Sequence, residues 1–345
     1  MKKLCTAAGF LAAVLFWTTA AFAAPQPAAH SAILLDADTG SVLFAQNEHD
    51  RSLIASTTKI MTGYLAAQYG ALQKTVTVPP EAVGVEGSSL YLKAGETVTR
   101  EMLLYGLMLQ SGNDAAAALA IDCAGSLDAF VRQMNDTAQK LGLTDTHYGN
   151  PHGLDAEGNY STAYDLAVLT AHALQNETFR TVVASKYAAF ETRTFANHNK
   201  LLWRYDGAIG VKTGFTKKAG RILVSAAMRG GRTLIAVTIN DSRDWQDHAA
   251  MLDYGFSRYQ STVLLRADQP IAVAANGAIL FASAPQDVVF PLAENEQIKI
   301  SYLLPKNVYS ARKGKTAGFA VLTLDGTAIA ATPLVWCSDY ESLRR

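Results

Sequence analysis

Three short motifs in this chain place nucleophiles, cations and amides in a pattern that suits acyl transfer. They are Ser56-Thr57-Thr58-Lys59, Ser111-Gly112-Asn113 and Lys212-Thr213-Gly214. A serine hydroxyl is a weak nucleophile at its own pKa and needs a nearby base. If Ser56 opens a helix, Lys59 lies one turn away on the same face and within reach of the hydroxyl. The first motif therefore predicts a serine nucleophile with a lysine base.

The other two motifs would support that pair. Lys59 can act as a base if burial and a second cation lower its pKa, and Lys212 would be that cation. The N-terminus of a helix also favours a developing negative charge. Ser111 and Asn113 fall at a break between two predicted helices, where side chains point into a cleft. Gly214 lies on a predicted strand, and its missing side chain would let a substrate backbone approach.

Each motif taken alone has an ordinary structural explanation: an N-cap serine, a solvated lysine, a loop asparagine or a strand-end glycine. The segment Ser310-Ala311-Arg312-Lys313 repeats the first spacing, but it lies among predicted strands, so we interpret it as chance. The occurrence of all three motifs in this order, on a helix, a loop and a strand respectively, favours one shared site.

The elements that must position these motifs begin with a hairpin. Apolar runs at Ser31–Asp36 and Ser41–Gln46 flank the turn Ala37-Asp38-Thr39-Gly40, a pattern typical of two antiparallel strands. Helical patterns follow, and Thr99 is suited to cap one of them. The predicted helices cover residues 56–67, 99–108, 114–123, 130–141 and 165–174.

Beyond Trp203 the pattern changes to strands. Three strands are predicted at residues 209–215, 222–228 and 233–239, and a helix over 247–254 should end at Gly255. Strands at both ends of a helical middle predict one sheet built from distant parts of the chain. From about residue 260 only strand-like segments remain, which predicts a second, all-β unit over residues 260–340.

Composition limits the class of protein. The 345 residues carry 30 Lys+Arg and 30 Asp+Glu, a balance that argues against a nucleic-acid-binding surface and against an acidic, disordered chain. Hydrophobic residues make up 49%, which is enough for a large core, and the length favours two domains.

The first 23 residues are predicted to be a signal peptide. Lys2 and Lys3 precede an apolar run over residues 7–17, and Ala21-Phe22-Ala23 offers a cleavage site. The apolar run is shorter than the about 20 residues of a membrane-spanning helix. We therefore expect an exported protein.

Neither a disulfide nor a metal site is expected. Cys123 and Cys337 lie far apart in the mature chain, so two buried thiols are favoured over a bridge. Neither cysteine has a partner at zinc spacing, and the seven histidines are scattered. Asp244 and His248 could share one helix face, which we interpret as solvated and not as a metal site. We expect no metal and no cofactor.

Longer segments around the motifs resemble the low-molecular-mass penicillin-binding proteins that are D-alanyl-D-alanine carboxypeptidases. These segments are Ala55-Ser56-Thr57-Thr58-Lys59-Ile60-Met61-Thr62, Gly149-Asn150-Pro151-His152-Gly153-Leu154-Asp155 and Gly210-Val211-Lys212-Thr213-Gly214-Phe215-Thr216. The similarity runs from about Ser31 to Phe256, and the all-β unit resembles the C-terminal domain of the same enzymes.

The resemblance implies an α+β fold. A catalytic domain like that of penicillin-binding proteins and serine β-lactamases would span residues 24–258, with an antiparallel sheet flanked by helices and a helical subdomain. A small all-β domain would span residues 260–340.

The resemblance also implies the reaction, which is removal of the terminal D-alanine from peptidoglycan stem pentapeptides ending in D-Ala-D-Ala. Ser56 would attack the carbonyl between the two D-alanines and form an acyl-enzyme, and Lys59 would take the serine proton. Ser111 would relay a proton to the departing D-alanine. β-Lactam antibiotics would be covalent inhibitors at Ser56.

Substrate binding is implied in the same way. Asn113 would hydrogen-bond the peptide amide, while Lys212 and Thr213 would hold the terminal carboxylate next to Gly214. The backbone N–H groups of Ser56 and Phe215 would form the oxyanion hole.

Two further residues have weaker assignments. Asp165 matches an acidic position near the family's site, with an exposed helix carboxylate as the alternative. Arg243 would add positive charge for the substrate carboxylate, with an ordinary loop arginine as the alternative. His198 and Phe215 stand where some relatives have arginine and histidine respectively, which bears on substrate preference and not on the reaction.

Three alternative functions can be compared with the sequence. A serine β-lactamase of class A deacylates with a glutamate-activated water, usually in a Glu-x-x-Leu-Asn stretch, and none occurs between Asn113 and Lys212. A D,D-endopeptidase acting on cross-linked peptides would use the same motifs. A catalytically silent wall-binding protein would have lost the nucleophile, the base or Lys-Thr-Gly, and none is lost.

The chain end bears on location. Many relatives end in an amphipathic membrane helix, but the residues after the last predicted strand, 336–345, are too few for one. We expect no C-terminal membrane anchor, and a location at the outer face of the cytoplasmic membrane, in the cell wall or in the periplasm.

Overall fold

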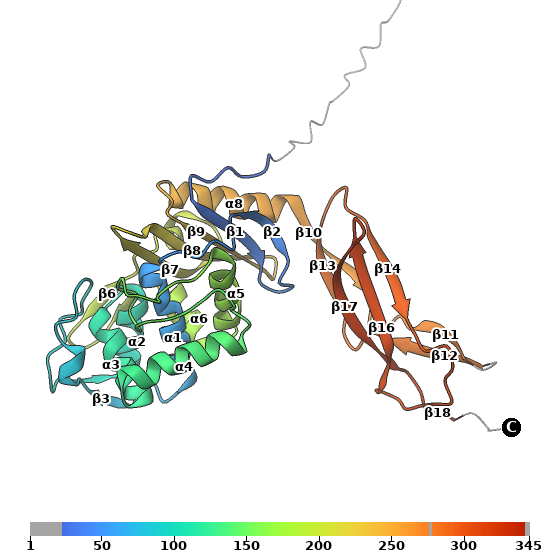
Figure 1. The fold of residues 1–345 in the computed structure, drawn as a ribbon, viewed down its shortest axis with the longest axis horizontal. Coiled ribbons are helices and arrows are strands. Elements are labelled where there is room, and N and C mark those ends of the chain that lie inside the picture. The colour runs from blue at the N-terminus through green and yellow to red at the C-terminus, as the bar shows by residue number, and fades with distance from the viewer. Residues whose placement is uncertain (1–22, 276–277, 342–345) are drawn as a thin grey trace, which may run out of the picture.

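The computed structural model describes residues 23–275 and 278–341 and contains two units (Figure 1). The predicted signal peptide therefore lies outside the described residues, apart from Ala23. The first unit combines a sheet with helices, and the second is an elongated all-β unit that starts where the long helix α8, Asp244–Arg258, meets strand β10, Tyr259–Leu265.

The first unit is built around a five-stranded antiparallel sheet in the order β2-β1-β9-β8-β7. Its strands are β1 (Ser31–Asp36), β2 (Val42–Gln46), β7 (Ala208–Thr216), β8 (Gly220–Arg229) and β9 (Arg232–Ile239). The N-terminal hairpin pairs with β9, so the prediction of a sheet assembled from distant parts of the chain is confirmed. Strand β7, which carries Lys-Thr-Gly, lies at the edge of the sheet.

Helices cover the face of the sheet opposite α8. They are α1 (Lys59–Gln68), α2 (Arg100–Leu109), α3 (Asn113–Ala124), α4 (Leu127–Lys140), α5 (Ala163–Leu174) and α6 (Glu177–Ala184), with 3₁₀ turns η1 (Ala55–Thr58) and η2 (Pro80–Ala82). The short helix α7 (Leu201–Arg204) lies on the α8 side, where Leu201 shares an apolar cluster with Leu223 and Met251. The predicted cap is confirmed, because the Met102 N–H donates to Thr99 Oγ1 over 3.1 Å. Helix α6 was not predicted. Two short hairpins, β3 (Thr75–Thr77) with β4 (Thr97–Thr99) and β5 (Tyr187–Ala189) with β6 (Thr194–Ala196), complete this part.

Helix α8 corrects two predictions. It continues through Gly255 to Arg258. A Cβ atom at Gly255 would lie 2.6 Å from a Leu234 methyl carbon and 2.7 Å from one of Leu34. The glycine lets the helix lie directly on the sheet and does not end it. The face that carries His248 is not solvated. The His248 ring is buried between Ser225 Oγ at 2.6 Å and Thr238 Oγ1 at 3.0 Å, and burial lowers its pKa to about 3.

The second unit forms its own core. Its main sheet has the order β11-β12-β17-β16-β14, with β11 (Ile271–Ala275), β12 (Ala278–Ser283), β14 (Ile298–Leu303), β16 (Thr316–Leu324) and β17 (Thr327–Trp336). Strand β10 pairs with β13 (Val288–Ala293), and β15 (Ser310–Ala311) with β18 (Tyr340–Glu341). Strand β13 carries Pro291, which cannot donate to a ladder. The repeated Ser-x-x-Lys spacing begins in β15, in this all-β unit.

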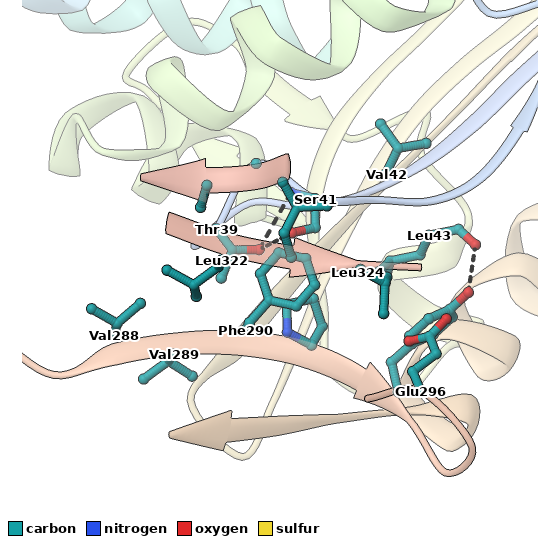
Figure 2. Close-up of a pocket in the computed structure, with 15 residues that line it drawn as sticks. Thr39, Ser41, Val42, Leu43, Val288, Val289, Phe290, Glu296, Leu322 and Leu324 are labelled. Atoms are coloured by element: carbon teal, nitrogen blue, oxygen red, sulfur yellow. Dashed lines mark hydrogen bonds between the residues drawn. The ribbon is translucent and has the colours of Figure 1, made fainter. Parts of the chain in front are cut away.

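The two units meet at the hairpin turn between β1 and β2. A cavity of about 390 Å³ lies there, between Ser41–Leu43 and the strands β13, β16 and β17 (Figure 2). The Tyr259 hydroxyl donates to the Leu43 carbonyl over 3.1 Å across this junction. No residue that lines the junction cavity also lines the cavity that contains Ser56.

Candidate active site

The predicted nucleophile stands on a tight turn packed against a second chain segment. Ser56 lies in the 3₁₀ turn η1, which leads into α1, and the preceding Ala55 has a left-handed backbone with φ of +45°. The Thr57 hydroxyl donates to the Ile54 carbonyl over 2.5 Å and closes the turn. Gly153 packs so closely that a Cβ atom there would overlap the Ala55 carbonyl. This packing holds the Ser56 hydroxyl in one place.

Lys59 is fully buried beside the nucleophile. Its Nζ atom lies 3.1 Å from Ser56 Oγ, 2.6 Å from Asn113 Oδ1 and 2.5 Å from the His152 carbonyl oxygen. Burial, followed by the positive charge of Lys212, holds the pKa of Lys59 well below its usual range. This environment therefore disfavours the charged form of Lys59 relative to a solvated lysine.

A neutral Lys59 is oriented by its two acceptors. An amine has two N–H donors and one lone pair. Asn113 Oδ1 and the His152 carbonyl can only accept hydrogen bonds, so they take both donors. The lone pair is then left for the third neighbour, the Ser56 hydroxyl. This is the arrangement that proton transfer from serine to lysine requires.

The break between α2 and α3 contributes two residues in different ways. Ser111 has φ of +62°, an unusual backbone for a serine, and it lines the cavity. Asn113 does not line the cavity, because both ends of its amide bind protein groups. Its Oδ1 atom accepts from Lys59, and its Nδ2 atom donates to the Glu86 carbonyl over 2.5 Å. Asn113 therefore orients Lys59.

Strand β7 brings the third motif against the nucleophile. Lys212 is 1% exposed, donates to the Thr213 carbonyl over 2.9 Å, and has its pKa lowered by burial to about 7. A Cβ atom at Gly214 would lie 3.3 Å from both Ile54 O and Ser56 N. The missing side chain thus lets the turn that carries Ser56 approach the strand. From sequence, this glycine is explained only by the approach of a substrate, and the structure corrects that reason.

A cavity of about 340 Å³ joins the motifs. Of the predicted site residues, Ser56, Ser111, Thr213, Gly214 and Phe215 line it. Lys59, Asn113 and Lys212 lie buried behind them. The lining residues that the motifs did not indicate are Ser88, Lys200, Arg221, Ile222, Asp244 and Trp245, together with His198, which was noted only as a departure from some relatives.

The structure does not bring Asp165 or Arg243 into this cavity. Asp165 is only 3% exposed, so it is not an exposed helix carboxylate either. It accepts hydrogen bonds from Asp145 N and Thr146 Oγ1, and burial raises its pKa. The Arg243 guanidinium donates to the Gln26 carbonyl over 3.1 Å and pairs with Asp247 at 3.4 Å.

The segment Gly149–Asp155, which had no assigned role, links α1 to β7. The Thr62 hydroxyl donates to the Pro151 carbonyl over 2.6 Å, and the Thr216 hydroxyl donates to Asp155 over 3.1 Å. Between these bonds, the segment presents the His152 carbonyl to Lys59. Sequence could not show this, because the functional atom belongs to the backbone.

Within residues 23–275 and 278–341, no three or more His, Cys, Asp or Glu side chains are grouped so that they could hold a metal ion. In the same part of the chain, no helix has the length and apolar character needed to cross a bilayer. Cys123 and Cys337 are unpaired and half-buried, and burial raises the pKa of Cys123 to about 12.

The chain is similar to one described family and to several known proteins. The family model described as D-alanyl-D-alanine carboxypeptidase matches residues 18–243. D-alanyl-D-alanine carboxypeptidase DacF of Bacillus subtilis is 33% identical over 334 residues, which cover 91% of this chain and 86% of that protein. Penicillin binding protein 5 of Haemophilus influenzae has a TM-score of 0.82 at 29% identity, over 93% of this chain and 99% of that chain. The Streptomyces K15 DD-transpeptidase has a TM-score of 0.64 at 35% identity, over 68% of this chain and 99% of that chain.

Proposed function

The chain belongs to the D-alanyl-D-alanine carboxypeptidase family, and from this premise we propose that its cavity removes the terminal D-alanine from peptidoglycan stem pentapeptides. One observation carries the assignment of roles: the fully buried Lys59 amine lies 3.1 Å from Ser56 Oγ, with two other acceptors that orient it. A lysine in that state can deprotonate a serine.

In the acylation step, Lys59 takes the proton of Ser56 while Oγ bonds to the carbonyl carbon between the two D-alanines. The carbonyl oxygen becomes an oxyanion, which the N–H groups of Ser56 and Phe215 stabilise. The close packing of Gly214 against Ser56 N supports this assignment, because it brings the two donor segments together. Loss of one such donor typically costs about 3–4 kcal/mol of transition-state stabilisation.

The intermediate then collapses. The C–N bond breaks, and the proton held by Lys59 passes through the Ser111 hydroxyl to the nitrogen of the departing D-alanine. Water next attacks the ester carbonyl and gives a proton to Lys59. The ester C–O bond then breaks, and Lys59 returns that proton to Ser56 Oγ as the shortened peptide leaves. Ser111 suits the relay because it lines the same cavity as Ser56.

Thr213 and the positive charge of Lys212 favour the substrate's terminal carboxylate. Thr213 lines the cavity, whereas Lys212 is buried against the Thr213 carbonyl and would act through its charge. A β-lactam presents a strained amide and a carboxylate in a similar arrangement, so it should acylate Ser56 and remain bound. No glutamate follows the class A pattern that would release it.

The domain limits and the location belong to the same proposal. We assign residues 24–258 to the catalytic domain and 260–340 to the C-terminal domain, which agrees with a separate apolar core around Val273, Leu280 and Trp336. Because the substrate is cell-wall peptide, we place the enzyme outside the cytoplasm, at the outer face of the membrane, in the wall or in the periplasm.

The test is release of free D-alanine from a stem pentapeptide by residues 24–345, compared with Ser56→Ala. We expect release by wild type alone, and a mass increase of one penicillin per molecule that Ser56→Ala abolishes. Release or acylation that survives in Ser56→Ala would contradict the assigned nucleophile. Penicillin acylation without D-alanine release would contradict the assigned substrate, and cross-linked peptide would then be assayed.

A further inference from the structure

The cavity contains an arginine that no motif indicates. Arg221 lies near the start of β8, directly opposite Phe215 on β7. Residues paired across a ladder project to the same face, and long side chains also reach the diagonal neighbour about 7–8 Å away. For Arg221 the diagonal neighbour on β7 is Thr213, which we assign to the substrate carboxylate. All three residues line the cavity.

An aspartate fixes this arginine in place. The Nε and Nη2 atoms of Arg221 both donate to Asp244 Oδ2, over 3.0 and 2.6 Å. Asp244 is itself buried and oriented, because its Oδ1 atom accepts from Trp245 N over 2.9 Å. The Arg221 side chain remains 46% exposed, and its Nη1 group makes no hydrogen bond to any residue in the described part of the chain. The result is a preoriented, unused pair of N–H donors.

The other cations near the cavity suit a carboxylate less well. Arg243 is bound to Gln26 and Asp247 and does not line the cavity. Burial and the charge of Lys212 lower the pKa of His198, which disfavours the charged form of its ring. Lys200 lines the cavity but offers a point charge on a flexible stem, without the planar fork that matches a carboxylate.

We propose that Arg221, positioned by Asp244, binds the C-terminal carboxylate of the substrate and makes the enzyme select peptides that end in a free acid. This inference rests on the proposed function, because it uses the substrate polarity assigned there. It moves the role that sequence suggested for Arg243 to a different residue.

The experiment compares a stem pentapeptide that ends in D-Ala-D-Ala acid with the same peptide capped as a carboxamide. Loss of a charged hydrogen bond should raise KM for the acid by roughly tenfold or more in Arg221→Gln. KM for the amide and kcat should change little. Arg221→Lys should recover part of the preference for the acid, and Asp244→Asn should weaken it to a smaller extent. Arg229→Gln is the matched control, because Arg229 lies near the other end of β8 and also pairs with an aspartate.

Two measurements keep the test decisive. Endpoint labelling with fluorescent penicillin counts folded sites in each variant, so misfolding cannot be mistaken for weak binding. Protection of Ser56 from that label by the acid and amide peptides measures binding without turnover. If Arg221→Gln keeps the wild-type preference in both assays, or if only Arg243→Gln or Lys200→Gln loses it, the inference is wrong. A wild type that is protected by the acid but releases no D-alanine contradicts the proposed function and leaves the arginine assignment standing.

Discussion

The residues behind Ser56 and the residues on the exposed wall of the cavity differ in burial. This difference separates the residues assigned to the reaction from those assigned to substrate selection. Behind the nucleophile, Lys59 and Lys212 are 0% and 1% exposed, and their pKa values are lowered. On the solvent-facing wall of the cavity, Phe215 is 65% exposed and Arg221 is half-exposed. Desolvation can tune a base only where water is excluded, whereas a selecting group must meet substrate from solvent. Substitutions on the buried side should therefore change rate and stability, and those on the wall should change preference.

The largest effect should come from Lys59→Arg. Arginine does not lose its proton near neutral pH, so it cannot offer the lone pair that a neutral lysine offers, and the base is removed. The rate of Ser56 acylation by penicillin should fall by roughly 10²–10⁴-fold. Stopped-flow acylation measures this rate, with the exposed helix-end Lys140→Arg as control. A rate within threefold of wild type would show that Lys59 is not the base.

The next effect should come from Gly153→Ala. The backbone at Gly153 has φ of +89°, and the added methyl group would meet the Ala55 carbonyl beside the nucleophile. We expect roughly tenfold or slower acylation, because small misplacements of reacting groups cost large factors in rate. The melting temperature should also fall.

The control is Gly125→Ala, at φ of +81° with open space around the added atom. It should cost about 1–2 kcal/mol of backbone strain and leave acylation unchanged. Equal acylation rates in the two alanine variants would show that the contact with Ala55 does not position Ser56.

The third effect should come from Lys212→Met, which should change both the stability of the protein and the pH dependence of acylation. Burial lowers the pKa of Lys212 from 10.5 to about 7. The folded state therefore binds the proton less readily than the unfolded state, and this group makes stability fall as pH drops from 10.5 towards 7. Lys212→Met removes that cost, so the melting temperature at pH 7 should rise by at least about 2 °C.

The same substitution should flatten the stability profile between pH 7 and 10.5. It should also raise the pKa of Lys59, because the charge of Lys212 lowers it, and so move the acid limb of acylation to higher pH. Calorimetry and acylation rates across this range check both shifts. A destabilised variant with an unchanged acid limb would contradict this account of the buried side.

The smallest effect should come from Phe215→Ala on the wall. The side chain is mostly exposed, and the backbone N–H assigned to the oxyanion hole is retained. Acylation by penicillin should stay within about threefold of wild type, since exposed side chains contribute little. KM values across peptides that differ in the penultimate residue should change more than kcat. A loss as large as that in Gly153→Ala would show that the two sides of the cavity are not separable.

Local features of the fold were predictable where neighbours in sequence decide them. The hairpin over residues 31–46 is predictable from two apolar runs that flank a turn, and the Thr99 cap from a side chain three residues before its partner. Predictions failed where a distant surface decides the outcome. In sequence, Gly255 is typical of a helix end, but in the fold it lets α8 pack on β1 and β9. His248 lies on a helix face that was predicted to be solvated, but Ser225 and Thr238 enclose it.

The site divides in the same way. By itself, the sequence determined that Ser56 and Lys59 lie one turn apart, because that spacing is a property of a single turn. Only the tertiary structure decided that Lys59 has a lowered pKa, since burial, Lys212 and the His152 carbonyl come from remote segments. It alone placed Arg221 in the cavity and turned Arg243 away. Asp244 binds Arg221 and the Gln26 carbonyl binds Arg243, and neither partner can be identified from its position in the sequence. Reactivity here depends on desolvation and on which donors converge, and both are properties of packed, distant residues.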